Sequence, residues 1–85
     1  MNLTLFQDPL CPFCMRVKQF LAQREIEIPM RNTMADAAAY KELIKGGGRA
    51  TVPCLKIERD DQSVEWLYES IDIMAFIETN VAQLS

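Results

Sequence analysis

Two cysteines separated by two residues, Cys11 and Cys14, are the side chains of this sequence best suited to chemistry. The chain has no histidine and one further cysteine, Cys54. A cysteine pair at this spacing can bind a metal, staple a fold or exchange electrons. A structural zinc ion takes four cysteine or histidine ligands, which three thiols cannot supply. The composition therefore favours thiol–disulfide exchange, and we expect no metal.

The residues that follow the pair predict a helix. Pro12 suits the first helical position, and apolar side chains then recur at helical spacing at Phe13, Val17, Phe20 and Leu21. Cys11 thus precedes a helix, whose free N–H groups and macrodipole stabilise a thiolate. We expect Cys11 to be the nucleophile. Cys14 lies one turn later and deeper, so it is expected to be the resolving thiol.

Length and charge limit the remaining possibilities. With 85 residues, of which 49% are hydrophobic, the chain should form one domain spanning residues 1–85. The net charge of −3 removes the electrostatic reason for binding nucleic acid or anionic membranes. No segment approaches the roughly 20 apolar residues of a membrane span, and the N-terminal residues do not have the pattern of a signal peptide. We therefore expect a cytoplasmic protein, in which a stable structural disulfide is unfavourable.

The first half of the chain alternates between strand and helix patterns. Residues 2–6 and 26–32 predict strands, the second at a sheet edge because Pro29 lacks an N–H. A helix is expected from about residue 34 to residue 45. Thr33 and Asp36 form a loose capping box before it, and three glycines follow it.

The second half predicts a hairpin and a last helix. Two alternating runs flank the polar segment RDDQS at residues 59–63, as in a β-hairpin. Ser70, with Asp72 in the first turn, is expected to cap the helix that follows. The apolar stripe of that helix comprises Ile73, Met74, Ile77 and Val81. The predicted order is β-α-β-α-β-β-α.

This order, with the cysteine pair at the first strand-to-helix junction, resembles the glutaredoxin branch of the thioredoxin fold. The segment CPFC at residues 11–14 is similar to the dithiol glutaredoxin signature, with Phe13 where a tyrosine is common. The segment GRATVP at residues 48–53 is similar to the stretch that precedes the family's cis-proline. The resemblance implies an α/β thioredoxin-like fold with a four-stranded mixed sheet flanked by helices. It also implies a glutathione-dependent thiol-disulfide oxidoreductase that acts on protein–glutathione mixed disulfides and on protein disulfides.

Glutathione as co-substrate would contact Phe13 and the segment from Thr51 to Pro53. If the Val52–Pro53 bond is cis, the Val52 N–H and C=O are free to pair with the extended cysteinyl backbone of glutathione. A tight turn entering the strand is the alternative explanation for this segment.

The two carboxylates of glutathione need partners of their own. The N–H groups and hydroxyl at Ser70 suit the γ-glutamyl carboxylate, and Glu69 suits the γ-glutamyl ammonium. Arg49 is the candidate for the glycyl carboxylate, because a guanidinium binds a carboxylate bidentately. Ordinary capping by Ser70 and a solvated loop position for Arg49 are the alternatives.

The segment ESID at residues 69–72 departs from the glycine pair and paired aspartates of glutaredoxins. It resembles the Glu-Ser pair of glutathione transferase N-terminal domains. A non-catalytic glutathione-binding module of that descent is therefore an alternative, and an iron–sulfur cluster carrier is another. The expected partners are glutathione and disulfide-bearing or glutathionylated proteins, and the chain is expected to be a monomer.

Two further residues leave a choice open. Cys54 follows Pro53 in an alternating run and is expected to be a core residue, with a regulatory thiol as the alternative. Asp8 occupies a position where glutaredoxins commonly carry Lys or Arg. Its negative charge would oppose ionisation of Cys11, or the residue simply begins the turn DPL.

Overall fold

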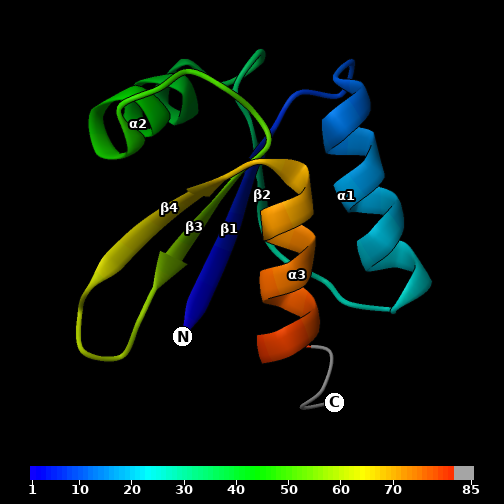
Figure 1. The fold of residues 1–85 in the computed structure, drawn as a ribbon. Helices are drawn as coiled ribbons and strands as arrows, with labels where there is room; N and C mark the ends of the chain where they lie inside the picture. Colours follow the sequence, from blue (N-terminus) through cyan, green and yellow to red (C-terminus); the bar gives the residue numbers. More distant parts are fainter. Residues whose placement is uncertain (82–85) are drawn as a thin grey trace.

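A four-stranded mixed sheet forms the centre of the computed structural model, which describes residues 1–81 (Figure 1). The strands are β1 (Asn2–Gln7), β2 (Met30–Asn32), β3 (Cys54–Glu58) and β4 (Val64–Tyr68). Their order in the sheet is β2-β1-β3-β4, with β1 parallel to β2 and the other neighbours antiparallel. This arrangement confirms the predicted thioredoxin-like fold.

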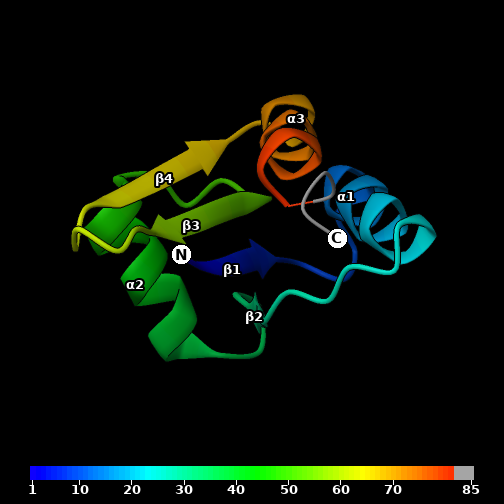
Figure 2. The same cartoon turned by 90° about the horizontal axis from the view of Figure 1, so that it is seen from below.

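Helices cover both faces of the sheet (Figure 2). Helices α1 (Pro12–Gln23) and α3 (Ser70–Asn80) pack side by side on one face, and α2 (Ala37–Gly47) lies on the other. Successive strand residues point to opposite faces, so Leu5 joins the α1/α3 core whereas Phe6 joins the α2 core. Among residues 1–81, none of the helices has the length and apolar character needed to span a bilayer.

The directions of the strands bring the candidate site segments together at one end of the sheet, the edge at which β1 and β4 finish and β3 begins. Strand β4 runs antiparallel to β3, which runs antiparallel to β1, so β1 and β4 end at the same edge. Helices α1 and α3 therefore both begin at this edge, where β3 also starts (Figure 1). Cys54 pairs with Phe6 on one side and with Tyr68 on the other. Pro53, Gln7 and Glu69 are thereby brought to the same edge.

Cys54 is fully buried in the α2 core, which confirms the expectation that it packs in the interior. Burial raises the pKa of its thiol to about 11, although the Tyr68 hydroxyl opposes the shift. The thiol therefore stays protonated at neutral pH.

The second strand is shorter than predicted, since β2 comprises only residues 30–32. Pro29 lies just before it and still contributes its carbonyl, which accepts a hydrogen bond from the Leu5 N–H at 2.9 Å. Ile28 is buried against the core without strand pairing. The edge position of this strand was predicted correctly.

The predicted start of α2 at residue 34 is also wrong. Asp36 is the N-cap, and its carboxylate accepts hydrogen bonds from the Ala38 and Ala39 N–H groups. The Asn32 side chain, not that of Thr33, accepts hydrogen bonds from the N–H groups of Met34 and Ala35. Thr33 and Asp36 therefore do not form a capping box. Aspartate at the N-cap satisfies two free N–H groups directly, which fixes the helix start three residues later.

The glycines after residue 45 have two different roles. Gly46 and Gly47 belong to α2, where a Cβ would overlap the rings of Trp66 and Tyr68 respectively. Only Gly48 takes the left-handed conformation of a helix end, with φ of 87°. The glycines therefore allow α2 to approach β4 closely.

Gly47→Ala should destabilise the protein although alanine is the better helix former. The rigid Tyr68 ring is buried against α2 and has little room to move. Overpacking costs about 1–3 kcal/mol and the gain in helix propensity is about 1 kcal/mol, so urea unfolding should show a net loss of up to about 2 kcal/mol. Lys45→Ala, at an exposed position of the same helix, should change the free energy by less than about 0.5 kcal/mol. Unchanged stability of Gly47→Ala would show that the α2–β4 contact has room for a side chain.

Candidate active site

The two thiols of the CPFC segment occupy different environments. Cys11 is the N-cap of α1 and is half-buried, and its thiol donates a weak hydrogen bond to the Val52 carbonyl at 3.8 Å. Cys14 lies in the first turn and is fully buried. Its sulfur accepts a hydrogen bond from the Asp8 N–H at 3.4 Å.

Burial raises the pKa of the Cys14 thiol to about 12; the Asp8 N–H opposes this shift, and the Cys11 side chain adds to it. Cys14 therefore stays protonated near neutral pH. Cys11 carries its thiol at the free end of α1, where N–H groups of the first turn favour negative charge. This difference suits Cys11 to attack first.

Asp8 takes part in the turn that leads into α1. Its carboxylate accepts a hydrogen bond from the Leu10 N–H at 2.9 Å, and its carbonyl accepts one from the Cys11 N–H at 3.1 Å. Asp8 thus forms the predicted turn, and the effect of its charge on Cys11 stays a prediction. The Asp8 charge also raises the pKa of Cys14, by less than burial and the neighbouring Cys11 do.

A pocket of about 470 Å³ opens next to the CPFC segment: Phe13 lines it, whereas Cys11 adjoins it through its contact with Val52. Three segments line it: the start of α1, the stretch before β3 and the start of α3. Six of the residues predicted to contact glutathione are among the lining side chains: Phe13, Thr51, Val52, Pro53, Glu69 and Ser70. The volume falls in the usual range for small-molecule sites, about 300–1,000 Å³.

The stretch before β3 presents its backbone to this pocket. The Val52–Pro53 peptide bond is cis, as the resemblance to the family's cis-proline segment implies. Within residues 1–81 the Val52 N–H has no hydrogen-bond acceptor, and the Val52 carbonyl has only the long contact with Cys11. A free donor and a nearly free acceptor on one residue can pair with another extended chain.

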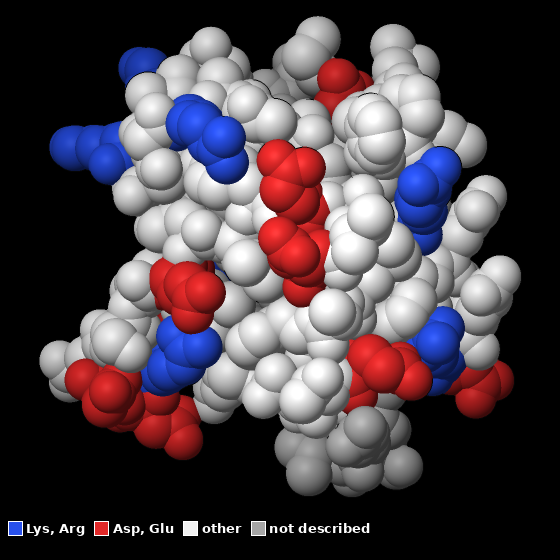
Figure 3. Space-filling view, in the orientation of Figure 1, with Lys and Arg blue, Asp and Glu red and all other residues white. Residues whose placement is uncertain are grey.

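The start of α3 differs from the prediction. Glu69, not Ser70, is the N-cap, with φ of 73° and no capping hydrogen bond from its side chain. Ser70 is the first helical residue and is buried. Within residues 1–81, the Glu69 side chain accepts no hydrogen bond from the first turn of α3, whose N–H groups can therefore bind an anion. In Figure 3, acidic side chains gather over this part of the molecule.

Arg49 lies outside the pocket lining. Its guanidinium stacks on the Tyr68 ring, 4.2 Å from the ring centroid, and its carbonyl accepts a hydrogen bond from the Tyr68 hydroxyl at 3.0 Å. These contacts hold the start of the segment that leads to Val52 and Pro53. Arg49 therefore stabilises this loop through its contacts with Tyr68.

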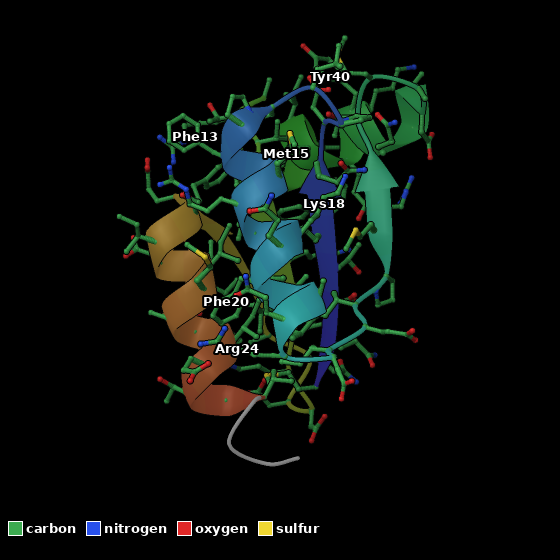
Figure 4. All side chains as sticks on the ribbon, turned by 90° about the vertical axis from the view of Figure 1, so that its right-hand side faces the viewer. Phe13, Met15, Lys18, Phe20, Arg24 and Tyr40 are labelled. Atoms are coloured by element: carbon green, nitrogen blue, oxygen red, sulfur yellow. The ribbon has the colours of Figure 1, made fainter. Side chains whose placement is uncertain are left out.

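Three lining residues, Arg16, Ile71 and Asp72, were not among the predicted site residues. Arg16 is the only cation of the lining and lies 5.8 Å from the Phe13 ring centroid. The spacing of three residues from Phe13 is the signal that could have identified it, because side chains three apart share a helix face. Figure 4 shows Phe13 on the side of α1 that faces α3, and Met15 and Lys18 on the other side.

Comparison with known proteins decides the family. The sequence model of the glutaredoxin family matches residues 3–64, most of the chain. Glutaredoxin 3 of Escherichia coli K12 is 32% identical over 57 residues, which cover 67% of this chain and 69% of that protein. The chain belongs to the glutaredoxin family. This membership makes it a glutathione-linked thiol oxidoreductase in general terms.

Solved structures share the glutaredoxin fold. Glutaredoxin from Brucella melitensis has a TM-score of 0.63 at 22% identity, and the match covers 98% of this chain and 84% of that one. A glutathione S-transferase from Methylobacillus flagellatus KT, solved with glutathione bound, has a TM-score of 0.70 at 20% identity. That match covers 94% of this chain and 37% of the transferase. The glutaredoxin fold of this chain thus corresponds to part of a larger transferase.

Proposed function

We propose that the protein reduces protein–glutathione mixed disulfides and protein disulfides, with Cys11 as nucleophile and Cys14 as resolving thiol. The observation that carries this proposal is the placement of the pair. A half-buried thiol at a helix start lies beside a pocket with a free backbone edge, and a buried, protonated thiol lies one turn behind it. We further propose that the chain acts as a monomer in the cytoplasm.

Reduction of a mixed disulfide needs only Cys11. The Cys11 thiolate attacks the glutathione sulfur, the sulfur–sulfur bond to the protein breaks, and the protein thiolate leaves and takes up a proton. Glutathione is then disulfide-bonded to Cys11. The thiolate of a second glutathione attacks the bound glutathione sulfur, which releases oxidised glutathione and the Cys11 thiolate.

Reduction of a protein disulfide uses both cysteines. Cys11 attacks one sulfur and forms a mixed disulfide with the substrate. Cys14 loses its proton and attacks the Cys11 sulfur, so that the substrate leaves as a dithiol and an intramolecular disulfide remains. Two glutathione molecules then restore the dithiol and leave as oxidised glutathione.

The pocket offers a partner for each part of glutathione. The Val52 N–H and C=O would pair with its cysteinyl backbone. Free N–H groups at Ser70 would bind the γ-glutamyl carboxylate, and Glu69 its ammonium. We assign the second carboxylate to Arg16 rather than to Arg49, because Arg16 lines the pocket and Arg49 is stacked on Tyr68. The transferase neighbour with bound glutathione supports a glutathione site on this fold.

A non-catalytic glutathione-binding module is the second candidate. The presence of Glu69 and Ser70 in the pocket lining favours it, because this pair resembles that of transferase N-terminal domains. Such a module would bind glutathione without turning over a disulfide.

Two measurements on the wild-type protein separate the candidates. The first follows the reduction of a cysteine–glutathione mixed disulfide, coupled to glutathione reductase and NADPH. The second measures glutathione binding by calorimetry. Turnover well above the uncatalysed rate supports the proposed enzyme, whereas binding without turnover supports the module. Absence of both would contradict either function.

A further inference from the structure

We propose that the surface around Cys11 selects polypeptide substrates that carry an apolar side chain next to their disulfide cysteine and a basic residue nearby. This proposal rests on the proposed oxidoreductase function and adds the chemistry of the preferred partner. Three exposed apolar side chains, called here the apolar rim, and three carboxylates carry it. The apolar rim comprises Leu10, Phe13 and Ile71.

The apolar rim is unusually exposed for side chains of its kind. Relative exposure is 85% for Leu10, 70% for Ile71 and 55% for Phe13. None of them packs in either core cluster of residues 1–81. Leu10 directly precedes the nucleophile, and Phe13 and Ile71 line the neighbouring pocket from α1 and α3. Apolar side chains grouped around a reactive atom indicate an interaction surface.

Leu10 is presented to solvent by a fixed turn. The Asp8 carboxylate holds its N–H, and the Asp8 carbonyl holds the N–H of the next residue, Cys11. Leu10 does not line the pocket proposed for glutathione. A small mixed disulfide can therefore reach Cys11 without covering Leu10. A substrate whose polypeptide chain continues on both sides of the disulfide cysteine would cover Leu10.

The charges around the rim are mainly negative. Glu69 and Asp72 line the pocket, and Asp8 is close enough to act on Cys14. Neither Glu69 nor Asp72 forms an ion pair within residues 1–81. Arg16 is the only cation of the lining.

Glutathione would use Glu69 and Arg16, which leaves Asp8 and Asp72 for the polypeptide. Asp72 follows Ile71 directly, so apolar and acidic groups lie together at the start of α3. A partner with Leu or a similar side chain would fit the apolar rim, and its Lys or Arg would pair with the two carboxylates. An acidic partner would be repelled.

Two synthetic peptides of equal length test this selection, each with one glutathionylated cysteine. One has Leu before the cysteine and two Lys residues after it, and the other has Ser and two Glu residues at these positions. In low salt, kcat/KM for the first should exceed that for the second by about tenfold or more, and high salt should reduce the difference. Equal kcat/KM values at both salt concentrations would overturn the proposal.

Variants assign the effect to residues. Leu10→Ser should lower kcat/KM for the Leu peptide by about fivefold or more, with the cysteine–glutathione mixed disulfide unaffected. Asp72→Asn should reduce the ratio between the two peptides, whereas Glu27→Gln, an equal charge change at an exposed position after α1, should leave it unchanged. An equal loss of Leu10→Ser on small and peptide substrates would overturn the role of the rim. No turnover of the small substrate by wild type would instead overturn the underlying function, and this selection with it.

Discussion

Cys11→Ser is expected to abolish glutathione-coupled reduction of mixed disulfides, with a loss on the order of 10³-fold or more. A serine hydroxyl is not ionised near neutral pH and does not attack disulfides. No other thiol can replace Cys11, because Cys14 and Cys54 are both fully buried and protonated. The measurement is the initial rate with a cysteine–glutathione mixed disulfide, followed by NADPH consumption.

Cys14→Ser is the matched variant for this experiment. It should keep most of the turnover of the mixed disulfide, since that route uses Cys11 and external glutathione alone. With a protein disulfide as substrate, it should stop at a mixed disulfide between Cys11 and the substrate, visible on a non-reducing gel. Residual activity of Cys11→Ser equal to that of the wild type would contradict the assignment of the nucleophile.

Iodoacetamide should alkylate Cys11 and leave Cys14 and Cys54 almost untouched in the folded protein. Burial gives the Cys14 thiol a pKa of about 12. At pH 7 such a thiol is ionised in about one molecule in 10⁵. Only the thiolate reacts, so Cys11 should be modified faster by about 10³-fold or more. Mass spectrometry of peptides after timed alkylation measures the three rates separately.

The pH dependence of the alkylation has a defined sign. Both buried pKa values are raised, so the thiolates of Cys14 and Cys54 should form only as the pH approaches about 12 and about 11. Unfolded thiols ionise near pH 8.5, whereas the buried thiols stay neutral to higher pH. Ionisation therefore favours the unfolded chain, and the free energy of unfolding should fall as the pH rises above about 8.5. Unfolding in guanidinium is the control and should make all three rates similar. Fast alkylation of folded Cys14 at pH 7 would show that this thiol is accessible and ionised.

Most of the element order could be predicted from the sequence because each element carries a local pattern. The α1 stripe, the hairpin around RDDQS and the cis-proline segment all depend on residues close together in the chain. The cap of α2 could not be settled locally, since Thr33 and Asp36 are both good caps three residues apart. The extent of β2 depends on its pairing with β1, which is a long-range property.

The cation proposed to bind the second glutathione carboxylate shows the same limit of sequence reasoning. The sequence favours Arg49 for this role because it directly precedes the ATVP segment, and only its place on a helix face points to Arg16. The position of the Tyr68 ring, on β4, decides that Arg49 turns away from the pocket. The need for Gly46 and Gly47 likewise becomes clear only when Trp66 and Tyr68 are seen beneath α2. Contacts between distant strands and helices determine these features.

The position of Cys54 on the α2 face determines which disulfides the folded protein can form. The sheet separates this thiol from α1, which carries the other two on the opposite face. Cys54 therefore cannot form a disulfide with either of them while the sheet is intact. Under the proposed function, the Cys11–Cys14 disulfide would then be the single oxidised form that the folded chain can adopt within one molecule. The three thiols would in that case act as a two-electron carrier that cannot rearrange to another pairing.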